Sequence, residues 1–244
     1  MSKGIYKSIL KSKADSKKQF AILIDPDKFD NTDLIDLAET ANVDFIMIGG
    51  SLIINNNLEN CIQTIKKKTT IPIIIFPGSH HQINNAADGI LLLSLISGRN
   101  PELLIGNHII AAPILKSSNL EILPTGYMLI ESGKQTSVLY VSNTNPIPSD
   151  KDDIAMCTAM AGEMLGLKLI YMDAGSGALN VISQSMIKKV SENISIPLII
   201  GGGINNAEKA ILACKAGADI IVVGNVLEKK PMLIKTIADT IHSF

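Results

Sequence analysis

Short, uninterrupted apolar runs along this chain alternate with longer segments in which apolar residues recur at helical spacing. The runs are rich in β-branched and aliphatic residues without polar alternation, as in 197–200 and 218–223. Strands that are buried on both faces have this composition, which is typical of a parallel sheet. The pattern predicts eight strands, at residues 20–24, 44–48, 72–76, 89–93, 125–131, 169–173, 197–200 and 218–223.

The segments between the runs predict helices. Start signals at Asn31 precede a helical pattern that ends near Ala41, and a short helix is expected near Ile83. Ser149-x-x-Asp152 resembles a capping box, and the helix that it opens should carry Ile154, Cys157, Ala161 and Met164 on one face. Pro231 should open the last helix, with Ile234, Ile237 and Ile241 facing inward.

Eight strand–helix alternations without a linker or a break in composition predict a single domain over residues 1–244. Right-handed βα crossovers in a chain of this length fit an α/β fold of the closed (β/α)8 TIM-barrel type. The polar, lysine-rich residues 1–18 would be a short N-terminal extension over one end of the fold. An open, doubly wound sheet is the alternative. It has no G-x-G-x-x-G motif to support it, because Gly201-Gly202-Gly203 is followed by Ile204-Asn205.

Composition narrows the class of protein. A hydrophobic content of 46% with 18% charged residues allows a substantial core, and a net charge of −1 gives no electrostatic case for nucleic-acid binding. The three cysteines are widely spaced and odd in number, which favours buried thiols in a reducing compartment over disulfides or a metal cluster. No apolar run approaches the ~18 residues of a membrane span. We therefore expect a soluble, cytoplasmic protein.

Glycine-rich loops follow the last three predicted strands, at 174–177, 201–203 and 224–225. In a (β/α)8 barrel these loops meet at the C-terminal edge of the strands, where phosphate groups bind after strands seven and eight. Backbone N–H groups and helix N-termini there would favour an anion. The alternative is that the glycines only permit tight turns. The pairing of such loops on adjacent strands favours a phosphate site.

Acidic side chains follow the first predicted strand. Asp25 is expected to point over the mouth of the barrel and to bind Mg²⁺, with the hydroxyl of Ser51 as a further ligand. Magnesium typically takes one or two protein oxygens together with substrate phosphates. In the alternative interpretation, Asp25-Pro26-Asp27 is only an Asx or proline turn with Asp27 solvated.

Asp173 ends the sixth predicted strand, with Tyr171 beside it. A carboxylate at this position can accept a hydrogen bond from a substrate hydroxyl and remove its proton, so Asp173 and Tyr171 are the candidate catalytic residues. Asp173 as a structural acceptor for loop amides is the alternative. His80 and His81 lie at the same edge, where anion binding and loop stabilisation are both open, and neither is given a catalytic role.

Five segments together resemble the geranylgeranylglyceryl phosphate synthase family: 24–28, 49–51, 171–177, 201–204 and 223–225. The likeness covers almost the whole chain in the expected order. It implies a modified barrel and a Mg²⁺-dependent prenyl transfer, in which the 3-hydroxyl of sn-glycerol 1-phosphate attacks C1 of an allylic prenyl diphosphate and releases diphosphate. It also implies that Asp25 and Ser51 bind magnesium. The glycerol phosphate would be held by Tyr171, Met172, Asp173, Ala174, Gly175, Ser176, Gly177, Gly202, Gly203, Gly224 and Asn225.

The sequence departs from the family pattern at two of these positions. Family members often carry Glu where Asp173 stands, so proton removal here would need a water molecule or a shifted acceptor. They often carry Thr where Ser51 stands, which keeps the ligand oxygen. The resemblance implies a C20 donor, with C35 open, and also a homo-oligomer and a peripheral membrane contact for product release.

Two other functions stay open at this point. A barrel isomerase or cyclase acting on a sugar or indole phosphate would share the phosphate loops, but it needs an acid/base pair across strands one and five, where only Asp25 and Glu131 are available. A non-catalytic phosphate-binding module would need no magnesium and would keep its affinity without Asp25.

Overall fold

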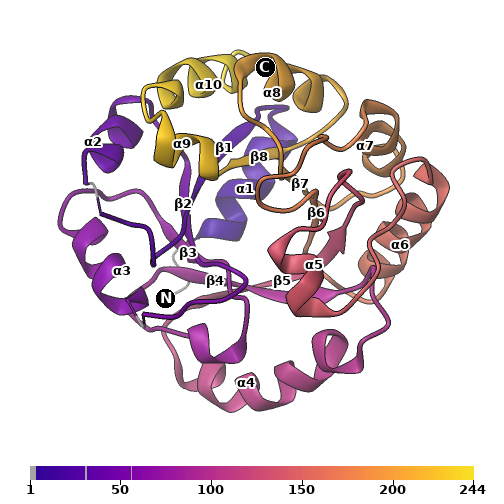
Figure 1. Ribbon diagram of the computed structural model, residues 1–244, viewed down its shortest axis with the longest axis horizontal. Coiled ribbons are helices and arrows are strands. Elements are labelled where there is room, and N and C mark those ends of the chain that lie inside the picture. The colour runs from indigo at the N-terminus through magenta and orange to yellow at the C-terminus, as the bar shows by residue number, and fades with distance from the viewer. Residues whose placement is uncertain (1–3, 31, 56) are drawn as a thin grey trace.

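The protein forms a closed barrel of eight parallel strands in the order β1 to β8 (Figure 1). The computed structural model describes residues 4–30, 32–55 and 57–244. The closed sheet confirms the predicted TIM barrel and excludes the open, doubly wound alternative. The strands are β1 Gln19–Ile24, β2 Phe45–Ile48, β3 Ile73–Ile75, β4 Gly89–Leu95, β5 Glu121–Leu129, β6 Leu169–Asp173, β7 Leu198–Gly201 and β8 Ile220–Val223.

Side chains alternate between the two faces of the strands, which divides the core into an inner and an outer cluster. Phe45, Tyr127 and Tyr171 belong to the inner cluster that fills the barrel. Their neighbours Ile46, Met128 and Met172 belong to the outer cluster between strands and helices. Both faces are therefore dry, which is why the strands show no polar alternation in the sequence.

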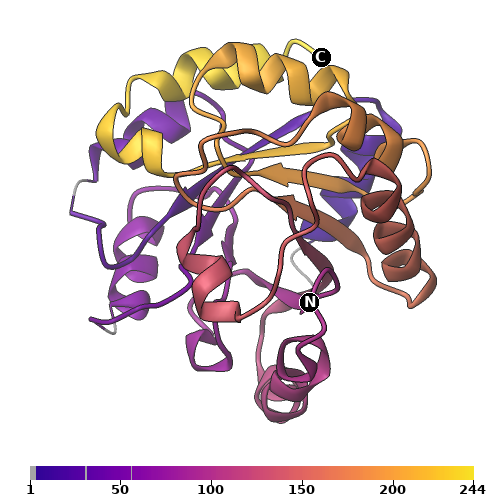
Figure 2. The same cartoon turned by 45° about the vertical axis from the view of Figure 1, so that its right-hand side comes forward.

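Helices surround the barrel and also cover parts of its two ends (Figures 1 and 2). The helix expected after Asn31 begins at Asp33, and Asn31 itself lies outside the described residues. Ile234, Ile237 and Ile241 of the last helix are buried, as predicted. The helices are α1 Ile5–Ala14, α2 Asp33–Thr40, α3 Leu58–Lys66, α4 Asn107–Ser117, α5 Ser137–Ser142, α6 Asp152–Met164, α7 Gln184–Ser191, α8 Ala207–Lys215, α9 Asn225–Lys229 and α10 Leu233–Ile241, with a 3₁₀ turn η1 His80–Gln82 and a π-helical segment η2 Glu102–Gly106.

Helix α1 closes the end of the barrel at which the strands begin. Ile5 and Ile9 join the inner cluster, and the backbone N–H groups of Ile5 and Tyr6 donate to the Glu121 carboxylate at the start of β5, both at 2.8 Å. The short helix expected within the N-terminal extension thus caps this end. Ligands can therefore enter only at the opposite end of the barrel, where the strands terminate.

The third βα unit lacks an α-helix. Strands β3 and β4 pair only at Ile74–Gly89 and Ile75–Ile90, and β4 then continues alone to Leu95 on that side. The helix expected near Ile83 is a single 3₁₀ turn at His80–Gln82. The wall of the barrel is therefore open between the upper ends of β3 and β4.

Helix α6 differs from its prediction in both its start and its buried face. Its N-cap is Lys151, because the backbone N–H and hydroxyl of Ser149 donate to the Glu131 carboxylate instead of capping the helix. The buried residues are Ala155, Ala159 and Gly162, whereas Ile154 and Met164 are exposed. A Cβ at Gly162 would lie 2.8 Å from the Ile96 side chain, so only a stripe of small residues lets α6 pack this closely.

Candidate active site

Unpaired backbone N–H groups gather where β6, β7 and β8 end. Within the described part of the chain, the amides of Ser176, Gly177, Gly202, Gly203 and Gly224 donate to no protein acceptor. The loops after β6 and β7 reach this arrangement through glycines in the left-handed region, with φ of 86° at Gly175, 69° at Gly177, 84° at Gly202 and 71° at Gly203. Free amides directed from adjacent loops form an anion-binding concavity. The short helix α9, which begins at Asn225 directly after β8, matches the usual phosphate site of the fold.

Two of these glycines are required by the protein's own packing. A Cβ at Gly202 would lie 2.6 Å from the Gly175 nitrogen and 2.8 Å from the Asp173 Oδ1, and a Cβ at Gly175 would lie 2.7 Å from the Thr136 hydroxyl. Close packing therefore requires glycine at Gly202 and Gly175, whatever their part in ligand binding. Their N–H groups differ, because that of Gly175 is used internally and that of Gly202 is free.

Asp173 lies buried beneath these loops, with 6% of its surface exposed. Its Oδ2 accepts a hydrogen bond of 2.6 Å from the Tyr127 hydroxyl, and its Oδ1 accepts one of 2.7 Å from the Gly175 amide. Burial raises the pKa of Asp173, while these two hydrogen bonds oppose the rise. A carboxylate has about four lone-pair positions, so acceptor capacity remains for a ligand. Asp173 therefore anchors the loop after β6, and its role as a base stays a prediction.

The residues around Asp173 divide by strand face. Tyr171 points into the barrel, where its hydroxyl occupies the space that a Cβ of Gly201 would fill. Burial raises the pKa of Tyr171 and of Tyr127, and the Asp173 carboxylate raises both further. Met172 and Ala174 instead belong to the outer cluster. Their side chains therefore face the surrounding helices, and only their backbone borders the loops at the barrel mouth.

Sequence reasoning missed Tyr127. Tyr127 lies four positions before Glu131, the residue on which the isomerase alternative depended. Its ring packs against those of Phe76 and Tyr171, with centroid distances of 5.8 and 5.5 Å. Glu131 itself is exposed and bonded to Ser149. Inward parity along β5 was the signal that could have found Tyr127.

Asp25 follows β1 at the same edge of the barrel as the free amides. Its Oδ2 accepts a hydrogen bond of 2.5 Å from the Lys28 ammonium, and its Oδ1 accepts one of 3.1 Å from the Asp27 amide, which forms the expected Asx turn. The carboxylate also faces the loop after β2, because a Cβ at Gly50 would lie 3.9 Å from it. Asp27 is not merely solvated, since it accepts from the amides of Ile54 and Asn55 in that loop.

The side-chain oxygens of Asp25 and Ser51 are the type of ligand that a hard cation such as Mg²⁺ takes. Among the residues that the structure describes, no group of three or more His, Cys, Asp or Glu side chains is placed to hold a metal ion. A carboxylate and a hydroxyl from neighbouring loops suit Mg²⁺, which keeps waters and takes phosphate oxygens for its other positions. Lys28 holds the Asp25 carboxylate at present, and a metal ion would have to replace that ammonium.

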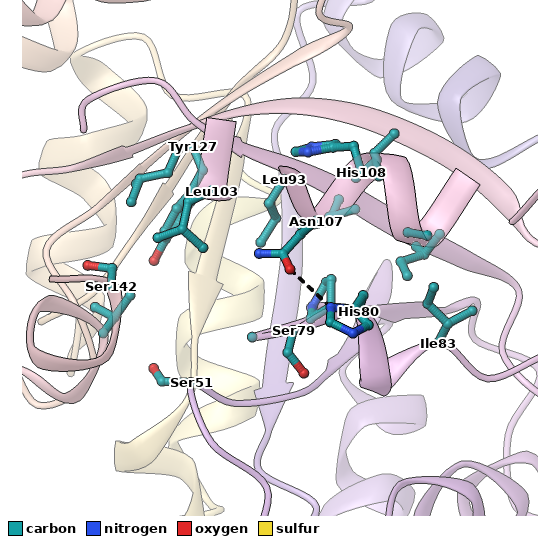
Figure 3. Close-up of a pocket in the computed structure, with 18 of the residues that line it drawn as sticks. Ser51, Ser79, His80, Ile83, Leu93, Leu103, Asn107, His108, Tyr127 and Ser142 are labelled. Atoms are coloured by element: carbon teal, nitrogen blue, oxygen red, sulfur yellow. Dashed lines mark hydrogen bonds between the residues drawn. The ribbon is translucent and has the colours of Figure 1, made fainter. Parts of the chain in front are cut away.

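A groove of about 850 Å³, including its open mouth, runs from this edge through the gap between β3 and β4 (Figure 3). Ser51, Ser79 and His80 lie at its polar part, and the rest is mainly aliphatic. The aliphatic lining includes Ile83, Ile90, Leu92, Leu93, Leu103, Ala111 and Leu115. Because no α-helix lies between β3 and β4, the inner face of α4 forms the outer wall of the groove.

Two histidines border the groove from opposite walls. The His80 Nδ1 atom and the Asn107 Oδ1 atom are 3.0 Å apart (Figure 3), and the rings of His80 and His81 lie 4.0 Å apart. Nδ1 of His108 is buried without a hydrogen-bond partner among the described residues, and burial lowers the pKa of this imidazole. His108 therefore favours its neutral form, which suits an apolar channel.

Comparisons with known proteins identify the family of this chain. Residues 13–241 match the PcrB family. A relative from Chitinophaga pinensis, named geranylgeranylglyceryl phosphate synthase, is 57% identical over 100% of this chain and 98% of its own length. A relative of the same name from Thermococcus kodakarensis is 39% identical over 93% of this chain and 90% of its own.

A solved structure extends the likeness to three dimensions. The (S)-3-O-geranylgeranylglyceryl phosphate synthase from Thermoplasma acidophilum, in complex with its substrate sn-glycerol-1-phosphate, superimposes with a TM-score of 0.91 at 32% identity, covering 98% of both chains. Within the described residues, no helix has the length and apolar character needed to cross a membrane. By its sequence and its fold, the chain belongs to the geranylgeranylglyceryl phosphate synthase (PcrB) family of enzymes.

Proposed function

We propose that this protein joins the 3-hydroxyl of sn-glycerol 1-phosphate to C1 of an allylic prenyl diphosphate, forming an ether and releasing diphosphate. One observation carries the proposal. The free amides of the late loops, the buried Asp173 carboxylate, Asp25 and an apolar groove all open at one edge of one barrel. The two substrates of a transfer must meet, and this edge brings an anion site next to a channel for an apolar chain.

Each part of the site has a separate task in this reaction. The amides at Ser176, Gly177, Gly202, Gly203 and Gly224 bind the phosphate of the acceptor, which leaves its hydroxyl end over the barrel mouth. Asp173 accepts the hydroxyl proton, directly or through a water molecule, while Tyr127 and Gly175 fix its orientation. Tyr171 fills the barrel below and keeps water from that side.

The donor end of the site uses the early loops. Asp25 and Ser51 would hold Mg²⁺, which stabilises the negative charge that builds on departing diphosphate. Lys28, released from Asp25, is then free to pair with the same diphosphate. The aliphatic groove would hold the prenyl chain and exclude water, which competes as a nucleophile for the allylic carbon.

The test is incubation with labelled sn-glycerol 1-phosphate, Mg²⁺ and allylic diphosphates of 10 to 35 carbons, followed by the mass of the product. We expect an ether product with C20 preferred, no product with glycerol lacking the phosphate, and loss of turnover after chelation. A phosphate-binding module would bind the label and form no ether. A barrel isomerase or cyclase would leave both substrates unchanged.

We further propose that the protein pairs with a second copy through the outer face of α4, which stands away from the barrel in both views (Figures 1 and 2). Ile105, Ile109, Ile110 and Ile114 expose 58%, 69%, 52% and 48% of their surface, and Lys116 is the single charged residue within α4. A helix that is apolar all round is normally buried. Helices that lie on membranes carry many Lys and Arg residues, whereas a face with little charge suits a two-fold interface with about 800 Å² buried per partner.

Ile109→Asp tests this pairing. Sedimentation should find a dimer for the parent and a monomer for the variant, because the interface of the variant would bury a carboxylate without a partner on each copy. Met164→Asp on α6, at 79% exposure, is the matched control and should stay dimeric. A monomeric parent that binds lipid vesicles, with binding lost in Ile109→Asp, would instead assign this face to the membrane contact for product release.

The three free thiols support a cytoplasmic location for either assembly.

A further inference from the structure

The loop between β5 and α5 places the Lys134 ammonium group beside the free amides of Ser176, Gly177, Gly202, Gly203 and Gly224, which together are called the amide cradle. A Cβ at Gly177 would lie 3.4 Å from the Lys134 Nζ atom and 3.8 Å from the Asn225 Nδ2 atom. Lys134 therefore meets the loop after β6 at the point where the loop after β8 also approaches it. Three chain segments that are far apart in the sequence thus converge on Gly177.

The backbone around Lys134 is held by contacts on both sides of this residue. Ahead of Lys134, the Asn180 amide donates to the Ser132 carbonyl at 3.1 Å, and Gly133 packs against the Asn180 side chain. Behind it, Thr136 is buried and packs on Gly175. The residues 132–136 therefore lie along the cradle loop as a fixed strap, and the flexibility of Lys134 is confined to its own side chain.

The ammonium of Lys134 is free to bind a ligand. In the described ranges of the chain, no carboxylate or carbonyl pairs with it, whereas Lys13, Lys66 and Lys235 each form an ion pair with an aspartate. Asn225 presents a side-chain amide to the same position of Gly177. A cation and neutral donors around a set of free amides match a doubly charged phosphate.

We infer that Lys134 binds the phosphate of the acceptor substrate and supplies a full positive charge to that subsite. The inference rests on the proposed function, because it takes the cradle to hold sn-glycerol 1-phosphate. The backbone amides give the phosphate its orientation, and Lys134 adds charge that distinguishes a phosphate from an uncharged polyol. The prenyl diphosphate is assigned to a different set of loops, near Asp25 after β1.

The variant Lys134→Met tests this role, since it keeps the length of the side chain and removes the charge. The Kd for sn-glycerol 1-phosphate from equilibrium dialysis and its KM should both rise roughly tenfold or more, as for loss of a hydrogen bond to a charged group. The kcat and the KM for the prenyl diphosphate should stay within about twofold. Inorganic phosphate, as a competitor, should lose potency by the same factor.

Two further variants separate charge from loop structure. Lys134→Arg should restore most of the affinity, and Gln135→Met, next to Lys134 on the same exposed strap, should leave it unchanged. An unchanged Kd in Lys134→Met, or a rise confined to the KM for the prenyl diphosphate, would overturn the inference. A parent that binds the phosphate but forms no ether would refute the proposed function and still leave the Lys134 binding result readable.

Discussion

Asp25→Ala should abolish turnover, by about 10³-fold or more, while sn-glycerol 1-phosphate binds with nearly normal affinity. Loss of the carboxylate removes the main magnesium ligand, and metal stabilisation of a leaving diphosphate contributes several kcal/mol to the transition state. The acceptor site is built from amides on other strands, so it does not depend on Asp25. Steady-state kinetics with Mg²⁺ and equilibrium dialysis of the labelled acceptor measure the two effects separately.

Two variants control for structure in this experiment. Asp25→Asn keeps an oxygen that can accept from the Asp27 amide, so the turn after β1 survives while the charge is lost, and its turnover should fall nearly as far. Asp150→Ala removes an exposed carboxylate and should behave like the parent. Turnover of Asp25→Ala equal to that of the parent, with magnesium present, would refute the metal role.

Asp173→Asn should reduce kcat by roughly 10²- to 10⁴-fold, the range of general-base catalysis. The amide has the same shape and retains one oxygen for the Tyr127 hydroxyl or the Gly175 amide, but it cannot take a proton. Thermal unfolding should show a folded protein. A loss below tenfold would mean that Asp173 serves only to anchor the loop.

The pH profile of the parent adds a second readout for Asp173. A base must be ionised, and burial raises the pKa of this carboxyl above its ordinary value of 3.8. The kcat should therefore fall on the acid side at a higher pH than an exposed aspartate would give. Tyr127→Phe removes a hydrogen bond that lowers this pKa, so it should move the acid limb to still higher pH. A limb that stays in place would separate Tyr127 from the base.

Much of the architecture follows from local pattern. Short aliphatic runs without polar alternation are typical of strands covered on both faces. Their spacing in the chain leaves room for one crossover each, so a parallel barrel was predictable. The direction of parallel strands then places Asp25, Asp173 and the late glycine loops at one edge, as the structure confirms. Family resemblance supplied the reaction, which pattern alone could not provide.

The details of the site depend on contacts that no local pattern encodes. The buried face of α6 is set by the close approach of Gly162 to Ile96, and the period of a helix does not say which stripe will meet the barrel. The groove exists because β3 and β4 separate after two paired residues and one 3₁₀ turn replaces a helix. Short apolar segments in the sequence do not reveal such a gap.

The sequence by itself determined the barrel, the edge at which ligands bind and the chemical type of the groups there, because the period of burial and the direction of the strands are local properties. Tertiary structure alone decided that Tyr127 bonds Asp173, that Met172 faces away and that Lys134 lies over Gly177. These relations join residues tens of positions apart. They depend on register and on the packing of whole elements, which only the folded chain fixes.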